Sequence, residues 1–155
     1  MFRFPRIVAA CLGLLAGSLA VFGADASATA HARVEVAPTK TSIYVGTVAM
    51  TMPAFTRVGG TYSSSYVAKV FPFFFSSESG RLSVEISDEM LRQLERGEAV
   101  EFTGRAVNEE GAERRIAGKA TPADAASGKI KVRVFVSRRI ELIFNTTYRF
   151  PDVKL

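Results

Sequence analysis

Few residues in this chain have the types and spacing that catalysis requires. His31 is the only histidine and Cys11 the only cysteine among the 155 residues. The sequence shows no Ser/His pairing, no cysteine placed as a nucleophile and no cluster with metal-ligand spacing. We expect His31 at the frayed start of the mature chain, or lost with an N-terminal leader. The pattern favours a protein that is not an enzyme and that uses no metal or cofactor.

Carboxylates leave one catalytic alternative open. Asp88 and Glu89 have the positions of helix-start residues, and Glu109 and Glu110 those of a turn. Folding could still bring two carboxylates together for glycosidase-type acid–base chemistry, although the sequence singles out no pair. A small periplasmic hydrolase that depends on carboxylates is therefore the alternative function.

The most unusual feature is a run of four rings in five residues, Phe71-Pro72-Phe73-Phe74-Phe75. In a continuous strand, Phe71, Phe73 and Phe75 share one side and Phe74 takes the other. Pro72 removes a ladder donor, which places the run at a sheet edge or a bulge. We predict that Phe74 is fully buried and that at least one of the other three rings is partly exposed. Such rings either pack in the core or form a pocket lip, a partner-docking patch or a membrane-contacting tip.

A second candidate site is basic. Lys129, Lys131 and Arg133 alternate along one predicted strand, and Arg115 and Lys119 lie on the outer face of the preceding one. If the two strands are neighbours in a sheet, the five side chains form a positive surface for an anionic partner. Alternatively they form a solvated outer face, which also discourages edge pairing. The chain's 20 basic and 15 acidic residues are interspersed, a balance that disfavours nucleic-acid binding.

The first 28 residues have the features of a cleaved export signal. Arg3 and Arg6 give a positive start, residues 7–22 are mostly apolar, and small residues follow at the spacing that signal peptidase recognises. Cleavage after Ala28 would leave a single domain, residues 29–155, in the periplasm or outside the cell. The apolar run is short for a membrane anchor, and Cys11 lies inside it rather than after it, which disfavours lipidation. The mature chain would contain no cysteine and therefore no disulfide bond. This is typical of a bacterial envelope protein whose stability comes from its hydrophobic core.

Alternating apolar residues predict strands through most of the domain. Residues 129–150 carry the clearest pattern, with β-branched and aromatic side chains at every second position. Taking Ser137-Arg138-Arg139 as the loop of a hairpin pairs Val134 with Leu142. The same register predicts one buried cluster, formed by Val132, Val134, Leu142 and Phe144.

Residues 98–121 predict a second hairpin. A three-residue loop, Glu109-Glu110-Gly111, keeps the apolar side chains of both strands on one face and gives Gly111 a positive φ. The same loop sets Glu101 opposite Lys119. Before this hairpin, one short helix is expected at about residues 88–96, with Ser87 as its N-cap and Gly97 just after its end.

Earlier segments with strand composition are residues 33–36, 43–52, 55–58, 61–75 and 81–86. Pro38 and Pro53 are expected to stop strands, and Gly46 indicates a bulge or a close backbone approach. Together these elements predict a mainly β fold. It is a single antiparallel barrel or sandwich of about seven or eight strands with one short α-helix.

The function that these features favour is that of an exported, non-catalytic envelope protein, either a binding or a structural module. Its partner would be a hydrophobic or amphiphilic ligand or another protein, and contact with a membrane surface, without spanning it, stays open. No nucleic acid is expected. Tyr148-Arg149-Phe150 resembles the end of an outer-membrane barrel's last strand, but the charged side chains at outward positions argue against that alternative.

Overall fold

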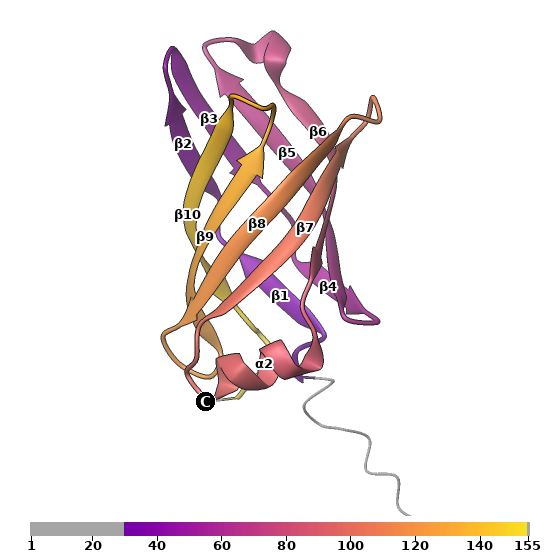
Figure 1. The fold of residues 1–155 in the computed structure, drawn as a ribbon, viewed down its shortest axis with the longest axis vertical. Coiled ribbons are helices and arrows are strands. Elements are labelled where there is room, and N and C mark those ends of the chain that lie inside the picture. Colours follow the sequence, from indigo (N-terminus) through magenta and orange to yellow (C-terminus); the bar gives the residue numbers. More distant parts are fainter. Residues whose placement is uncertain (1–29, 155) are drawn as a thin grey trace, which may run out of the picture.

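The computed structural model describes residues 30–154 and shows a closed antiparallel β-barrel with one short helix at its end (Figure 1). The predicted leader lies outside the described residues. The strands are β1 (Arg33–Val36), β2 (Thr39–Ile43), β3 (Gly46–Thr51), β4 (Phe55–Val58), β5 (Thr61–Phe71), β6 (Glu78–Glu85), β7 (Val100–Asn108), β8 (Glu113–Pro122), β9 (Ser127–Phe135) and β10 (Glu141–Arg149). The 3-10 turn η1 (Phe74–Ser76) and the helix α2 (Asp88–Glu95) interrupt them.

Ten strand segments make an eight-stranded barrel because two pairs of segments each act as one strand. β1 and β2 lie end to end along β10: Glu35 pairs with Arg149, and the Thr39 hydroxyl donates to the Asn145 carbonyl at 3.0 Å. β3 and β4 both pair with β5 in the same way. Since β5 also pairs with β6, the sheet closes on itself. Of the two architectures that the sequence left open, the barrel is the one formed.

Both predicted hairpin registers are confirmed. β9 and β10 pair Val134 with Leu142 and Val132 with Phe144. Val134 and Phe144 are buried, and the other two side chains pack against the same core. The apolar alternation fixes this register because a slip of one residue would turn every apolar side chain of a strand outward.

The β7–β8 hairpin has the expected three-residue loop. Glu101 pairs with Lys119, and Gly111 has a φ of +84°. An L-residue in this left-handed conformation is strained, because its Cβ approaches the following carbonyl oxygen.

Gly111→Val is therefore expected to lower the free energy of unfolding by about 1–2 kcal/mol. Glu110→Ala, on the exposed part of the same loop, is expected to change it by less than about 0.5 kcal/mol. Urea titration of both variants beside the wild type measures the difference. Two equal, small changes would contradict this loop geometry.

The N-terminal strands differ from the expectation in two places. Residues 43–52 are not one strand, since β2 ends at Ile43, a turn follows at Tyr44-Val45, and β3 begins at Gly46. The strand expected over residues 61–75 ends at Phe71. Gly46 does make a close backbone approach, because a Cβ there would overlap the Phe71 carbonyl oxygen. The turn at Tyr44-Val45 therefore lies beside the end of β5.

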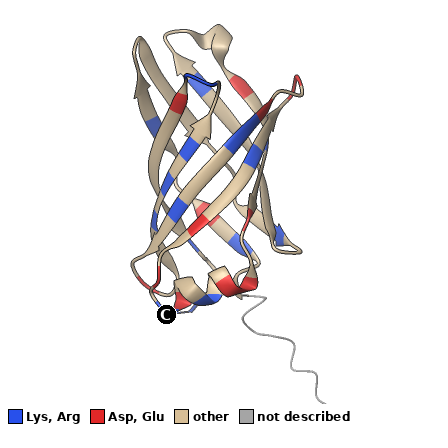
Figure 2. Ribbon diagram, in the orientation of Figure 1, with Lys and Arg blue, Asp and Glu red and all other residues tan. Residues whose placement is uncertain are grey.

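Apolar side chains fill the barrel, while polar side chains cover it. Tyr62, Ile116, Phe144 and Tyr148 are among the buried residues, and the outward positions of β8 and β9 are mostly charged. Figure 2 shows where basic and acidic residues lie along these strands. This distribution is the reverse of that in barrels with an apolar outer band and a polar interior.

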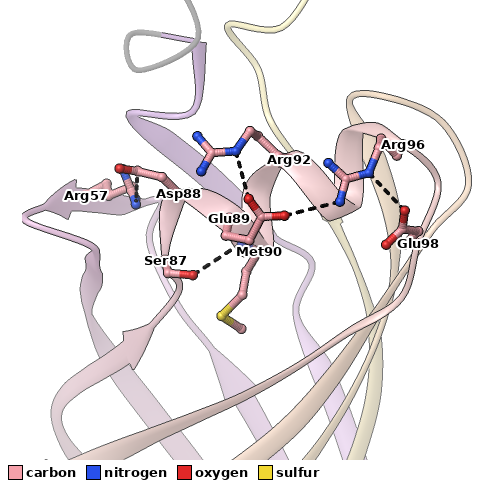
Figure 3. Close-up of polar contacts among 8 residues, drawn as sticks. All are labelled: Arg57, Ser87, Asp88, Glu89, Met90, Arg92, Arg96 and Glu98. Carbon is pink, nitrogen blue, oxygen red and sulfur yellow. Dashed lines mark hydrogen bonds and ion pairs between the residues drawn. The ribbon is translucent and has the colours of Figure 1, made fainter.

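Helix α2 closes one end of the barrel (Figure 1). Its bounds agree with the prediction to within one residue, and the Ser87 hydroxyl accepts a hydrogen bond from the Met90 amide at 3.2 Å, as an N-cap does (Figure 3). Leu91 and Leu94 are buried. Arg57 of β4 fixes the start of the helix, since it donates to the Asp88 carboxylate at 2.8 Å. Within the described range, no helix is long and apolar enough to cross a membrane.

The expectation that His31 lies at a frayed terminus is wrong. Its side chain is buried, and its ring meets that of Phe150 edge to face, with the ring centroids 4.6 Å apart. The Tyr62 hydroxyl donates to the His31 carbonyl at 2.6 Å, and the His31 Nδ1 atom lies 3.7 Å from Glu95. The histidine therefore packs into the end of the barrel that α2 closes, where a frayed terminus would not.

Candidate functional site

The barrel interior has little room for a ligand. A cavity of about 100 Å³ lies in its core, lined mainly by apolar side chains, including Leu94, Phe102, Ile116 and Phe144. Sites for drug-sized molecules measure roughly 300–1,000 Å³. An eight-stranded barrel is narrow enough for side chains to fill it, and here they nearly do. A site for a larger partner must therefore be sought on the outside.

A polar cluster occupies the interior above this cavity, toward the end opposite α2. Glu78 of β6 accepts hydrogen bonds from the Tyr66 hydroxyl at 3.0 Å and from Asn108 at 3.3 Å. The Arg114 guanidinium donates to the same carboxylate at 3.3 Å. Burial, together with the hydrogen bond to Glu78, raises the pKa of Tyr66 to about 12, so its hydroxyl remains a donor at neutral pH.

Sequence reasoning missed this cluster, although a signal was present. Arg114 shares its inward parity with Ile116, and Glu78 shares the parity of Leu82. Glu78 lies between the strands predicted over residues 61–75 and 81–86, among serines and a glycine that are typical of turns. The cluster contains one carboxylate, whereas glycosidase-type chemistry requires two. Across residues 30–154, no group of three or more His, Cys, Asp or Glu side chains could hold a metal ion.

The four phenylalanines lie at the end of β5 and in the loop that leads to β6, at the end of the barrel opposite α2 (Figure 1). β5 ends at Phe71, a cis Phe71–Pro72 bond follows, and η1 then turns the chain back. The Ser77 amide donates to the Phe74 carbonyl at 3.1 Å, and the Ser77 hydroxyl accepts from the Val70 amide at 3.1 Å. These hydrogen bonds give the loop a defined shape.

The rings pair with one another rather than with the core. Phe71 meets Phe74, and Phe73 meets Phe75, each pair edge to face with centroids 5.7 Å apart. Their exposed fractions are 61% for Phe71, 37% for Phe73, 63% for Phe74 and 86% for Phe75. Partial exposure of the odd-numbered rings is confirmed. Burial of Phe74 is wrong, because the strand on which that prediction rested ends at Phe71 and the 3-10 turn points the next rings outward.

Two further apolar side chains stand beside this loop. Tyr44 and Val45, in the β2–β3 turn, are exposed. Their turn adjoins the loop, since Thr47 of β3 pairs with Phe71. We call the six side chains together the aromatic tip: Tyr44, Val45, Phe71, Phe73, Phe74 and Phe75. The sequence indicated four of them, and the other two were missed because residues 43–52 were read as one strand.

The five basic residues predicted to share a face do share it. β8 and β9 are neighbours, with Lys119 opposite Lys131 and Thr121 opposite Lys129. Arg115, one of the five, lies over the Phe135 ring, with its guanidinium carbon 4.3 Å from the ring centroid. Like charges directly opposite each other in a sheet are unfavourable, so this basic face would gain from an anionic neighbour.

Acidic side chains nevertheless interrupt the basic face. Arg133 forms an ion pair with Glu141 at 3.4 Å, and Glu101 lies opposite Lys119. A depression of about 890 Å³ over these strands is lined by Lys131 and Arg133 but also by Glu85 and Glu101. Both signs of charge line the depression. The preference of the basic face for an anionic partner is therefore weaker than its five cations alone would give. The aromatic tip is the stronger candidate site.

Comparisons of this chain with protein-family models, with curated proteins and with solved structures gave no match. A function for the protein therefore has to be inferred from the geometry of its candidate sites.

Proposed function

We propose that the protein is an exported, non-catalytic binding module of the bacterial cell envelope, which holds a hydrophobic or amphiphilic partner on its aromatic tip. The observation that carries the proposal is the exposure of four phenylalanine rings on one hydrogen-bonded loop. Leaving a phenylalanine in water forgoes about 1.5–3 kcal/mol of burial free energy. Contiguous exposed apolar surface in a soluble domain marks a site of interaction.

Two further observations support this proposal. The cavity of about 100 Å³ is too small for an amphiphilic molecule of ordinary size, which favours binding at the outside. Glu78 is engaged by three polar partners inside the barrel, which favours a structural role for that carboxylate over an acid–base role. Export rests on the leader features of the sequence, notably Arg3, Arg6 and the small residues before Thr29.

The Phe74→Ala/Phe75→Ala double variant is expected to lose most of the binding of an environment-sensitive apolar dye that the wild-type protein shows. Both rings are mostly exposed, so the free energy of unfolding should change by no more than about 0.5 kcal/mol. Dye fluorescence and a urea titration, run on the same preparations, measure the two quantities.

A matched control is Val58→Ala. Val58 is 80% exposed and lies in the β4–β5 hairpin, at the end of the barrel that α2 closes. This variant should bind the dye as the wild type does. Unchanged dye binding by the double variant would overturn the assignment of the aromatic tip as the binding site.

A further inference from the structure

The charges around the aromatic tip narrow the choice of partner. Lys69 precedes Phe71 by two residues on the same face of β5, which places it about 7 Å farther from the tip. Ala49 pairs with both Lys69 and Lys40, so the two lysines lie in one row across β2, β3 and β5. A row of ammonium groups thus stands directly behind the exposed rings.

The β9–β10 loop adds two more cations at the same end of the barrel (Figures 1 and 2). Arg138 and Arg139 are exposed there, next to Ile140, which is also exposed. Of the ion pairs in the described part of the chain, none involves Lys40, Lys69, Arg138 or Arg139. The four cations are therefore available to an external anion.

The shape of the tip also bears on the partner. Phe75 and Tyr44 are among its most exposed side chains and come from separate loops, so the apolar surface projects outward. The depression next to Phe74 and Phe75 is lined largely by polar side chains, among them Ser77 and Glu109. Rings that project outward, with no apolar groove beside them, are better suited to insertion into a soft apolar medium such as lipid than to docking against the side chains of a folded protein.

From these observations, and resting on the proposed function, we infer that the tip's partner is the surface of a lipid bilayer that contains anionic lipid. An amphipathic helix at a bilayer surface buries its apolar face about 5–10 Å into the boundary between headgroups and acyl chains, and we take the same depth for the rings of the aromatic tip. With the rings at that depth, the row of Lys40 and Lys69 lies at the level of the headgroup phosphates. Long basic side chains reach this level readily because their stems are apolar.

Acidic residues at the same end set the orientation. Glu109 and Glu110 lie in the β7–β8 loop, and Glu109 accepts a hydrogen bond from the Ser79 hydroxyl at 2.7 Å. An anionic surface repels this loop. The barrel is therefore tilted toward the β2–β3 turn, which keeps the β7–β8 loop farther from the bilayer, even though Glu109 and Glu110 line the depression beside Phe74 and Phe75.

Co-sedimentation of the purified protein with vesicles tests the inference. We expect binding to vesicles of phosphatidylcholine mixed with phosphatidylglycerol, and binding at least about tenfold weaker to phosphatidylcholine alone. Phe74→Ser/Phe75→Ser should abolish binding to both. Lys40→Gln/Lys69→Gln should weaken binding to the anionic vesicles by about tenfold or more and leave dye binding unchanged.

Two variants serve as matched controls: Val58→Ser, an exposed apolar side chain at the opposite end, and Lys129→Gln/Lys131→Gln, an equal loss of charge on the basic face. Both should bind the anionic vesicles as the wild type does. Equal binding to neutral and anionic vesicles, or an equal loss with Lys129→Gln/Lys131→Gln, would overturn the inference.

The inference and the proposed function can fail separately. Suppose that dye binding depends on Phe74 and Phe75 but the protein binds no vesicles. This result would contradict the inference of a bilayer partner and would still support the aromatic tip as an apolar binding site. A wild-type dimer that Phe74→Ser/Phe75→Ser converts to a monomer, with no vesicle binding, would instead assign the tip to a second copy of this chain. Dye and vesicle binding both unaffected by the Phe variant would overturn the inference and the proposed function together.

Discussion

Phe144→Ala is expected to lower the free energy of unfolding by about 3–5 kcal/mol, whereas the same truncation of Phe75 should cost less than about 0.5 kcal/mol. Phe144 is 2% exposed and lies on the inner face of β10, where its ring lines the core cavity. Truncation would enlarge a void that the barrel wall cannot collapse to fill, since a closed sheet holds its strands apart. Phe75 is 86% exposed and has little packing to lose.

Because both variants remove the same atoms, the comparison isolates the effect of position. Urea titrations with a common slope measure the two free energies. A loss of about 3 kcal/mol or more at Phe75 would mean that its ring is packed, and the aromatic tip would then be part of the core. A change below about 0.5 kcal/mol at Phe144 would contradict the strand register that turns this ring inward.

Gly80→Val is the second substitution with a large expected effect, a loss of about 3 kcal/mol. Gly80 of β6 pairs with Asn108 of β7. A Cβ at this position would overlap the Val107 carbonyl oxygen and lie 2.7 Å from the Asn108 Cα atom. Backbone atoms cannot rotate away as a side chain does, so the two strands would have to separate next to the polar cluster.

Ser83→Val is the matched control for this variant. It adds a β-branched side chain to the outer face of the same strand, where Ser83 pairs with Arg105. We expect a change in the free energy of unfolding of no more than about 0.5 kcal/mol. Thermal unfolding of both variants provides the comparison. Equal and small shifts would show that β6 and β7 are not in such close contact at Gly80.

Strand parity predicted the C-terminal half of the barrel well, for a physical reason. In β7–β10 one face meets the core and the other meets water, so the alternation specifies both the register and the loop length. Gly111, at φ +84°, illustrates how one loop residue then follows from the register. Closure into a barrel was not predictable in this way, because a sandwich requires the same inward and outward pattern.

The errors arise where a local pattern in the sequence was taken to determine a feature that depends on the rest of the fold. Phe74 was placed by extending a period of two beyond Pro72, but the chain leaves the sheet there and enters η1. The turn at Tyr44-Val45 was missed because both residues are typical of strands. His31 was assigned to a frayed terminus from its place in the sequence alone, whereas burial depends on contacts with Phe150 and Tyr62 that come from far along the chain.

For the candidate sites, the sequence predicted the grouping of side chains better than their surroundings. The basic face required only that β8 and β9 be neighbours, as hairpins in sequence usually are. To predict which residues surround the phenylalanines, one would have to know that β2, β3 and the β9–β10 loop reach the same end of the barrel. That is a property of the closed sheet, and no local pattern around residues 71–75 encodes it.

The pairing of β1/β2 with β10 joins the first and last strands of the barrel. Across it, Arg149 donates a hydrogen bond to the Glu35 carboxylate at 2.8 Å, and the two residues are 114 positions apart in the sequence. The other pairings connect strands that lie closer together in the sequence, including the non-consecutive pairs β1–β4 and β3–β5, so they require shorter stretches of chain to close. A chain that emerges amino-terminus first can therefore build the barrel wall progressively but cannot close it until β10 arrives. During that interval β1/β2 and β9 present open edges to other chains. The last strand thus sets how long the nascent protein is exposed to aggregation.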